Sequence, residues 1–85
     1  MEVFKTPIEG LLVIEPKVFR DARGYFVETY NEQRYREAGV DATFVQDNQS
    51  CSSFGVVRGL HFQRPPFTQS KLVRCVKVKV IDVAV

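Results

Sequence analysis

The chain is 85 residues long, 45% of its residues are hydrophobic, and 12 basic against 10 acidic residues give a net charge of +2. This length permits at most one small domain, and the composition is typical of a globular protein rather than a disordered one. The small net charge without a basic tract excludes a nucleic-acid-binding protein as a first hypothesis, and no apolar run approaches a membrane span.

The N-terminus and the cysteines bear on location and metal binding. Residues Met1 to Lys5 lack the long apolar centre of a signal peptide, so we expect a cytoplasmic protein. Cys51 and Cys75 have no neighbouring cysteine and only one histidine, His61, to share, so no metal site is expected. In that compartment both cysteines are expected to be free thiols, buried or half-buried.

An N-terminal arm over residues 1–30 is predicted to contain β-strands. Leu11 to Ile14 is a continuous apolar run closed by Pro16, which suits a buried or subunit-bridging strand. Residues 19–24 are polar and predict a turn, because Asp21 and Gly24 favour one. The aromatic and β-branched run from Tyr25 to Tyr30 predicts the next strand.

One short helix is predicted after the arm, over about residues 31–38. Asn31 is a good N-terminal cap, and Gly39 is a good stop. Two helical turns are too few to be stable by propensity, so this helix must be held by packing.

A strand is predicted over about residues 43–50. Side chains alternate along a strand, so Phe44, Gln46 and Asn48 are expected to share one face. Two amides on one face of an apolar strand need hydrogen-bonding partners in the protein or in a ligand. The alternative is that both amides lie on a solvated face.

The next predicted strand, over about residues 56–63, carries His61, the only histidine of the chain. Histidine titrates near neutral pH and is therefore a candidate general base, although a structural role is the alternative. Arg58 and His61 are three residues apart, so a regular strand would place them on opposite faces. If both serve one pocket, Gly59 must allow a bulge or kink.

The last predicted β-rich stretch covers residues 71–85. It exceeds an ordinary strand in length, so we expect a hairpin with a bend near Lys77 to Lys79. The chain then ends on the apolar run from Ile81 to Val85, whose edge would be unpaired. We therefore expect a single domain or a domain fragment that forms the N-terminal half of a larger fold.

Several motifs in this order resemble the dTDP-4-dehydrorhamnose 3,5-epimerase family. They are Arg20-Asp21-Ala22-Arg23-Gly24-Tyr25-Phe26, Phe44-Val45-Gln46-Asp47-Asn48, Arg58-Gly59-Leu60-His61-Phe62-Gln63 and Lys71-Leu72-Val73-Arg74. The resemblance covers essentially the whole chain but only the first half of such an enzyme. It implies a mainly β fold, an antiparallel jelly-roll or cupin-like barrel of which this chain would supply the first half. Two positions depart from the family pattern, namely Gln49 in place of a common histidine and Val78 in place of a glycine.

The resemblance also implies a chemistry that needs neither a metal nor a cofactor. In that family the residue matching His61 removes protons at C3 and C5 of a dTDP-4-keto-6-deoxyhexose, and the residue matching Lys71 stabilises the enolate. These roles agree with what epimerisation beside a ketone requires, which is a base and a group that holds the enolate oxygen. The family's proton donor, a tyrosine in its second half, has no counterpart here, so we expect this chain to be catalytically incomplete.

The resemblance further implies the residues that bind the nucleotide-sugar. Arginine suits a pyrophosphate because its planar fork can bond two oxygens at once. Members of the family form homodimers in which the N-terminal arm of one subunit reaches the pocket of the other. Arg23 and Glu28 are therefore expected to serve a neighbouring subunit. The expected binding residues are Arg23, Glu28, Gln46, Asn48 and Arg58.

Two other hypotheses remain open from the sequence. One is a non-catalytic β module that pairs with another chain through its strand edges, favoured by the valine-rich final stretch. The other is a dTDP-sugar ketoisomerase of the same superfamily, which the string from Arg58 to Gln63 favours less than the epimerase.

Overall fold

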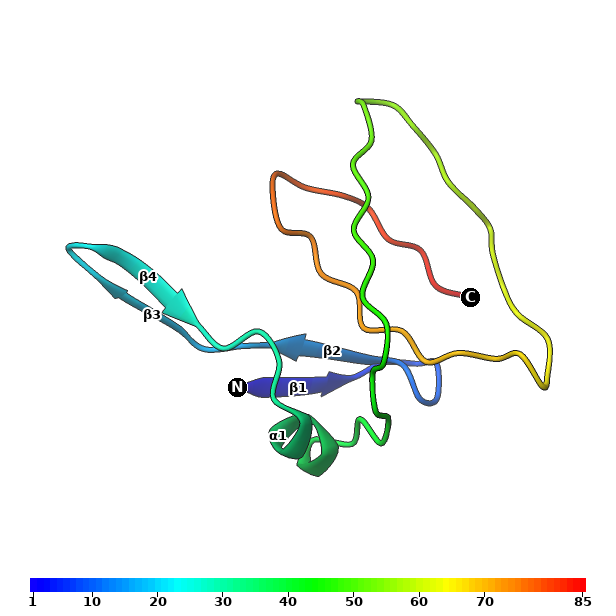
Figure 1. Ribbon diagram of the computed structural model, residues 1–85, viewed down its shortest axis with the longest axis horizontal. Helices are drawn as coiled ribbons and strands as arrows, with labels where there is room; N and C mark the ends of the chain where they lie inside the picture. The colour runs from blue at the N-terminus through cyan, green and yellow to red at the C-terminus, as the bar shows by residue number, and fades with distance from the viewer. The chain divides into compact units, whose positions relative to one another are not determined.

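The computed structural model describes residues 1–85 and is mainly β, as predicted (Figure 1). Contacts within the chain divide it into two units, residues 1–41 with 81–85 and residues 42–80, which are described separately below. All regular elements lie in the first unit; they are β1 (Glu2–Lys5), β2 (Leu12–Glu15), β3 (Val18–Asp21), β4 (Gly24–Val27) and α1 (Glu32–Glu37). No helix is long and apolar enough to cross a membrane. Closure into a barrel stays a prediction, as does the assignment of the whole chain to one domain.

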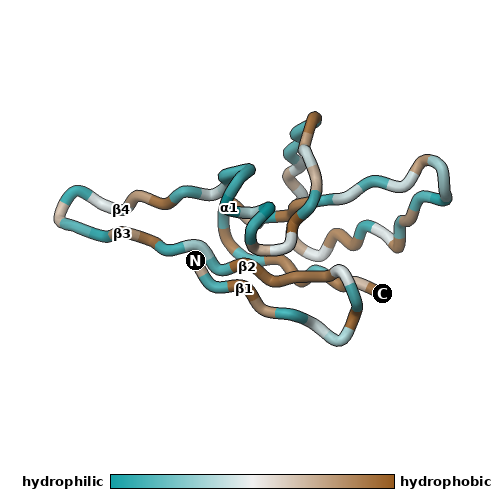
Figure 2. Tube along the Cα trace, turned by 90° about the horizontal axis from the view of Figure 1, so that it is seen from below, coloured by the Kyte–Doolittle hydropathy of each residue, from teal (hydrophilic) through white to brown (hydrophobic).

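Strands β1 and β2 form an antiparallel hairpin in which Glu2 pairs with Glu15 and Lys5 with Leu12. The strand predicted over Leu11 to Ile14 is confirmed as β2, whereas β1 was not predicted. Alternate β2 residues are partly buried, so this strand has one covered and one open face instead of being buried on both. Figure 2 shows the hydrophobic character of β2. The Thr6 hydroxyl stabilises the connecting loop, since it donates to the carbonyl of Leu11 at 2.9 Å.

Strands β3 and β4 form a second antiparallel hairpin, with Phe19 opposite Phe26 and Asp21 opposite Gly24. The strand predicted from Tyr25 onward is confirmed, although it ends at Val27. The prediction of a turn over residues 19–24 is wrong for its first half, because β3 extends to Asp21. The turn is confined to two residues, and Gly24 begins the return strand at φ +136°, a conformation that glycine adopts without strain.

Helix α1 is confirmed, together with both of its predicted end signals. The Asn31 side chain accepts a hydrogen bond from the Arg34 backbone N–H at 2.9 Å, which satisfies a donor left free at the helix start. At the other end, Gly39 has φ +107°. Its N–H donates to the carbonyl of Arg36, and the Val40 N–H donates to the carbonyl of Tyr35. These two bonds form a Schellman motif that ends the helix.

Tyr35 is the one buried residue of the structure, at 4% exposure. Its ring meets the ring of Tyr30 edge to face, with centroids 5.0 Å apart, and its hydroxyl donates to the carbonyl of Thr29 at 2.6 Å. This packing holds the end of the arm against α1, as expected for a helix too short to be stable alone.

The second unit, residues 42–80, contains no paired strand. The strands predicted over 43–50, 56–63 and 71–85 are absent from the structure. The physical reason is that strand propensity becomes a strand only when the backbone N–H and C=O groups meet a partner strand, and here none does. The apolar side chains are correspondingly exposed, Val57 to 91% and Phe62 to 79%.

Two backbone positions in this unit behave as their sequence context predicts. Gly59 has φ +128°, so the predicted irregularity between Arg58 and His61 is present, although not within a strand. The predicted bend at Lys77 to Lys79 is also present, and it forces Val78 to φ +67°. Cys51 and Cys75 are free, as predicted, but exposed, because no element packs over them.

Candidate functional site

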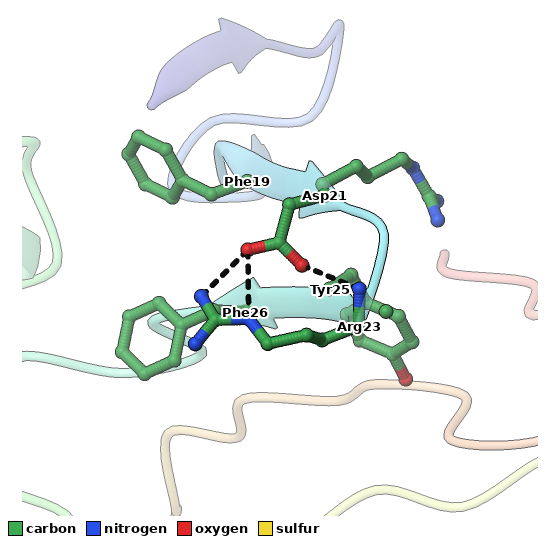
Figure 3. A pocket seen from close by; sticks show the side chains of 7 residues that line it. Phe19, Asp21, Arg23, Tyr25 and Phe26 are labelled. Carbon is green, nitrogen blue, oxygen red and sulfur yellow. Dashed lines mark hydrogen bonds and ion pairs between the residues drawn. The ribbon is translucent and has the colours of Figure 1, made fainter.

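A hollow lies on the β3–β4 hairpin of the first unit. It has a volume of about 460 Å³ and is open to solvent (Figure 3). Its lining combines three aromatic rings with two arginines and a carboxylate; the residues are Phe19, Arg20, Asp21, Arg23, Gly24, Tyr25 and Phe26. Such a surface offers flat apolar contacts beside cationic hydrogen-bond donors, which together suit a ligand with both a planar ring and an anionic group.

The register of the hairpin assigns these side chains to two faces. Phe19 and Phe26 are directly opposite each other and share one face with Asp21, because residues two apart on a strand point the same way. Arg20 and Tyr25 are the pair on the other face, where the guanidinium lies 5.5 Å from the ring centroid. That distance is within the range of a cation–π contact, which orients Arg20.

Arg23, a predicted binding residue, is held by Asp21. Its Nη2 and Nε donate to Asp21 Oδ2 at 2.7 and 3.2 Å, and its backbone N–H donates to Oδ1 at 2.8 Å (Figure 3). These hydrogen bonds favour the charged carboxylate and lower the pKa of Asp21 below its usual 3.8. The guanidinium nevertheless remains 91% exposed.

Glu28, another predicted binding residue, lies just after β4 and is paired with helix α1. Arg34 Nη1 donates to Glu28 Oε1 at 2.7 Å. Both side chains are substantially exposed, so this ion pair contributes little to stability and leaves Glu28 accessible.

In the second unit the structure brings two predicted binding residues together. Gln46 Nε2 donates to Asn48 Oδ1 at 3.4 Å, so these amides share one side of the chain, as the alternation predicted. Arg58 Nη2 donates to the carbonyl of Cys51, also at 3.4 Å. Both bonds are long and weak, so all three side chains keep donors for other partners.

The two predicted catalytic residues, His61 and Lys71, are exposed and make no hydrogen bond or ion pair. The structure does not join them, and neither lines the hairpin hollow. Their catalytic pairing therefore stays a prediction, as do the binding roles of the other five residues.

Sequence reasoning missed Asp21 and Arg34 as the partners of Arg23 and Glu28. The first could have been found, because an aspartate two residues before a turn residue commonly accepts that residue's N–H. The second had no sequence signal, since Arg34 lies six positions after Glu28 in the chain, on α1.

Comparison with known proteins gives a consistent result over the whole chain. Residues 5–85 match the family described as dTDP-4-dehydrorhamnose 3,5-epimerase. Curated relatives with that name include proteins from Salmonella typhimurium (56% identical; 100% of this chain, 47% of the relative), Shigella flexneri (55%; 100% and 48%) and Methanothermobacter thermautotrophicus (53%; 95% and 43%). The chain thus spans about half the length of the curated relatives it matches. No solved structure matches it.

Proposed function

The chain belongs to the dTDP-4-dehydrorhamnose 3,5-epimerase family, and on that premise we propose that it serves the epimerisation of a dTDP-4-keto-6-deoxyhexose at C3 and C5. The observation that carries the proposal is the extent of the match. It begins at residue 5 and continues to residue 85, so it includes all seven candidate residues.

In the proposed reaction His61 is the base. Its imidazole takes the proton from the carbon beside the ketone, and the electron pair of the broken C–H bond moves toward the C4 oxygen. The Lys71 ammonium stabilises the negative charge that develops there. A proton returned to the opposite face of the carbon completes the inversion. Support comes from the residue types and from the exposure of both side chains to solvent.

The proposed binding residues divide between the two units of the chain. Gln46, Asn48 and Arg58 belong to residues 42–80, whereas Arg23 and Glu28 belong to the first unit. We assign Arg23 and Glu28 to a neighbouring subunit's pocket in a cytoplasmic homodimer. Their exposed, charged groups at the β3–β4 hairpin and just after it are available to such a ligand.

The proposal is tested by following solvent deuterium into C3 and C5 of the keto-sugar nucleotide by NMR. This exchange requires a base and an enolate-stabilising group, and it depends less than net epimerisation on the acid that returns a proton. We expect measurable exchange with the protein and none above background with His61→Asn. Equal exchange by the protein and His61→Asn would refute the role of His61.

A second function is favoured by the exposed apolar side chains of residues 42–80. Leu60 and Phe62 alternate with His61 and Gln63 along a segment that has no strand partner, and both apolar side chains are exposed. Such a segment can add to the edge of another sheet. A non-catalytic pairing module would dimerise as its concentration rises and would show no affinity for dTDP. Isothermal titration with dTDP, combined with sedimentation analysis, separates this function from the epimerase.

A further inference from the structure

Asp21 accepts hydrogen bonds from only some of the N–H donors of the Arg23 guanidinium. Arginine has five N–H donors, and Asp21 engages two of them, one on Nε and one on Nη2. Three donors remain, at Nη1 and on the outer side of Nη2. This free end of the guanidinium has the spacing that binds two oxygens of a phosphate or carboxylate.

The exposure of the pair limits its contribution to stability. The side chain of Arg23 is 91% exposed and that of Asp21 is 52% exposed, so solvent screens the attraction between them. Ion pairs this exposed contribute little to the free energy of folding. What the contact does achieve is to restrict a long, flexible side chain to one orientation.

That orientation places the guanidinium beside aromatic rings. Asp21 shares its face of the hairpin with the opposed pair of Phe19 and Phe26, and these three side chains line the same hollow as Arg23 (Figure 3). The free donors of Arg23 are therefore held beside a hollow whose aromatic rings can contact the flat, apolar part of a ligand.

We propose that Asp21 is a positioning residue, which holds the Arg23 guanidinium with its free edge presented to the pyrophosphate of the nucleotide-sugar. This inference rests on the proposed function, which makes Arg23 a nucleotide-binding residue. Because the arginine is restrained before the ligand arrives, less side-chain freedom is lost on binding. The gain in affinity expected from restraining one such side chain is roughly three- to tenfold.

The test is the affinity for dTDP, measured by isothermal titration for the protein and for Asp21→Asn, Arg23→Ala and the double variant. Asparagine keeps an oxygen to accept the Arg23 backbone N–H, so the turn is retained while the acceptor for the guanidinium is lost. We expect Asp21→Asn to weaken binding three- to tenfold and Arg23→Ala to weaken it more. The double variant should bind as Arg23→Ala does, since Asp21 acts only through Arg23.

The outcomes separate the inference from the proposed function. If Arg23→Ala weakens binding while Asp21→Asn equals or exceeds the unmodified protein, the positioning role is overturned and the nucleotide-binding role stands. If Arg23→Ala has no effect, the nucleotide-binding role of Arg23 fails, and the positioning role fails with it. Should Asp21→Asn not fold, Asp21→Ser replaces it, because serine can also accept the turn N–H.

Discussion

The hydroxyl of Tyr35 donates a 2.6 Å hydrogen bond to the backbone carbonyl of Thr29, six residues earlier in the chain. Tyr35 lies on α1, and Thr29 lies two residues after the end of β4. The bond therefore joins the arm to the only helix, at the only buried side chain of the structure.

Removing that hydroxyl should lower the free energy of unfolding. Tyr35→Phe leaves the Thr29 carbonyl without its partner, at a cost of about 1 kcal/mol, and Tyr35→Ala also removes the buried ring, at a cost of about 3–5 kcal/mol. Urea unfolding followed by circular dichroism measures both. The control is Tyr25→Phe, whose side chain is largely exposed and should change stability by less than about 0.5 kcal/mol. Equal effects of the two Phe variants would contradict the importance of the Thr29 bond.

The N-terminal cap of α1 can be tested independently. Asn31→Ala removes the acceptor for the Arg34 N–H and should reduce stability by about 1 kcal/mol, with a smaller helical signal at 222 nm. Asn31→Ser retains a capping oxygen and should stay close to the unmodified protein. A loss of the same size in the serine variant would show that something other than capping is at work.

Replacing Val78 with glycine should increase the stability of the protein. A β-branched residue at φ +67° is strained by about 1–2 kcal/mol, whereas glycine adopts this conformation freely. Because glycine also gives the unfolded chain more freedom, the expected net gain from Val78→Gly is about 0.5–1 kcal/mol. Val76→Gly is the matched control at a position without positive φ, and it should destabilise the protein. A stabilising Val76→Gly, or a destabilising Val78→Gly, would rule out strain at this bend.

The Asp21–Arg23 pair makes the β3–β4 hairpin sensitive to acid. The pKa of Asp21 is lowered in the folded protein by the hydrogen bonds from Arg23, so the contribution of this group to stability is present above pH 3.8. It is lost as the pH falls through the lowered pKa. NMR titration of the Asp21 carboxyl should show this low pKa in the protein and a higher value in Arg23→Ala. An unchanged pKa in that variant would contradict the pairing in solution.

Lys71 offers a charge-specific test of the proposed enolate stabilisation. Lys71→Met removes the ammonium while keeping most of the side-chain length, and it should reduce deuterium exchange at C3 and C5 by about 10²-fold or more. Lys77→Met is the matched control, because it removes another exposed ammonium from the same unit. Similar losses in both variants would indicate a general electrostatic effect instead of a specific role for Lys71.

Local sequence signals predict most of the secondary structure of the first unit. Asn31 and Gly39 mark the ends of α1 correctly because caps act through hydrogen bonds within a few residues. Likewise, β2 and β4 follow from apolar and aromatic runs next to tight turns. The mainly β class, the irregularity at Gly59 and the bend near Val78 also follow from local residue preferences.

Pairing was decided by the tertiary structure alone. Residues 43–50, 56–63 and 71–85 have strand composition, yet they form no strands here, because a strand exists only when its backbone hydrogen-bonds to a neighbour. The family resemblance likewise named Glu28 as a binding residue, but no sequence signal identified Arg34 as its partner. Composition indicates which secondary structure a segment prefers, whereas a strand also needs a partner strand, which the composition of the segment does not specify.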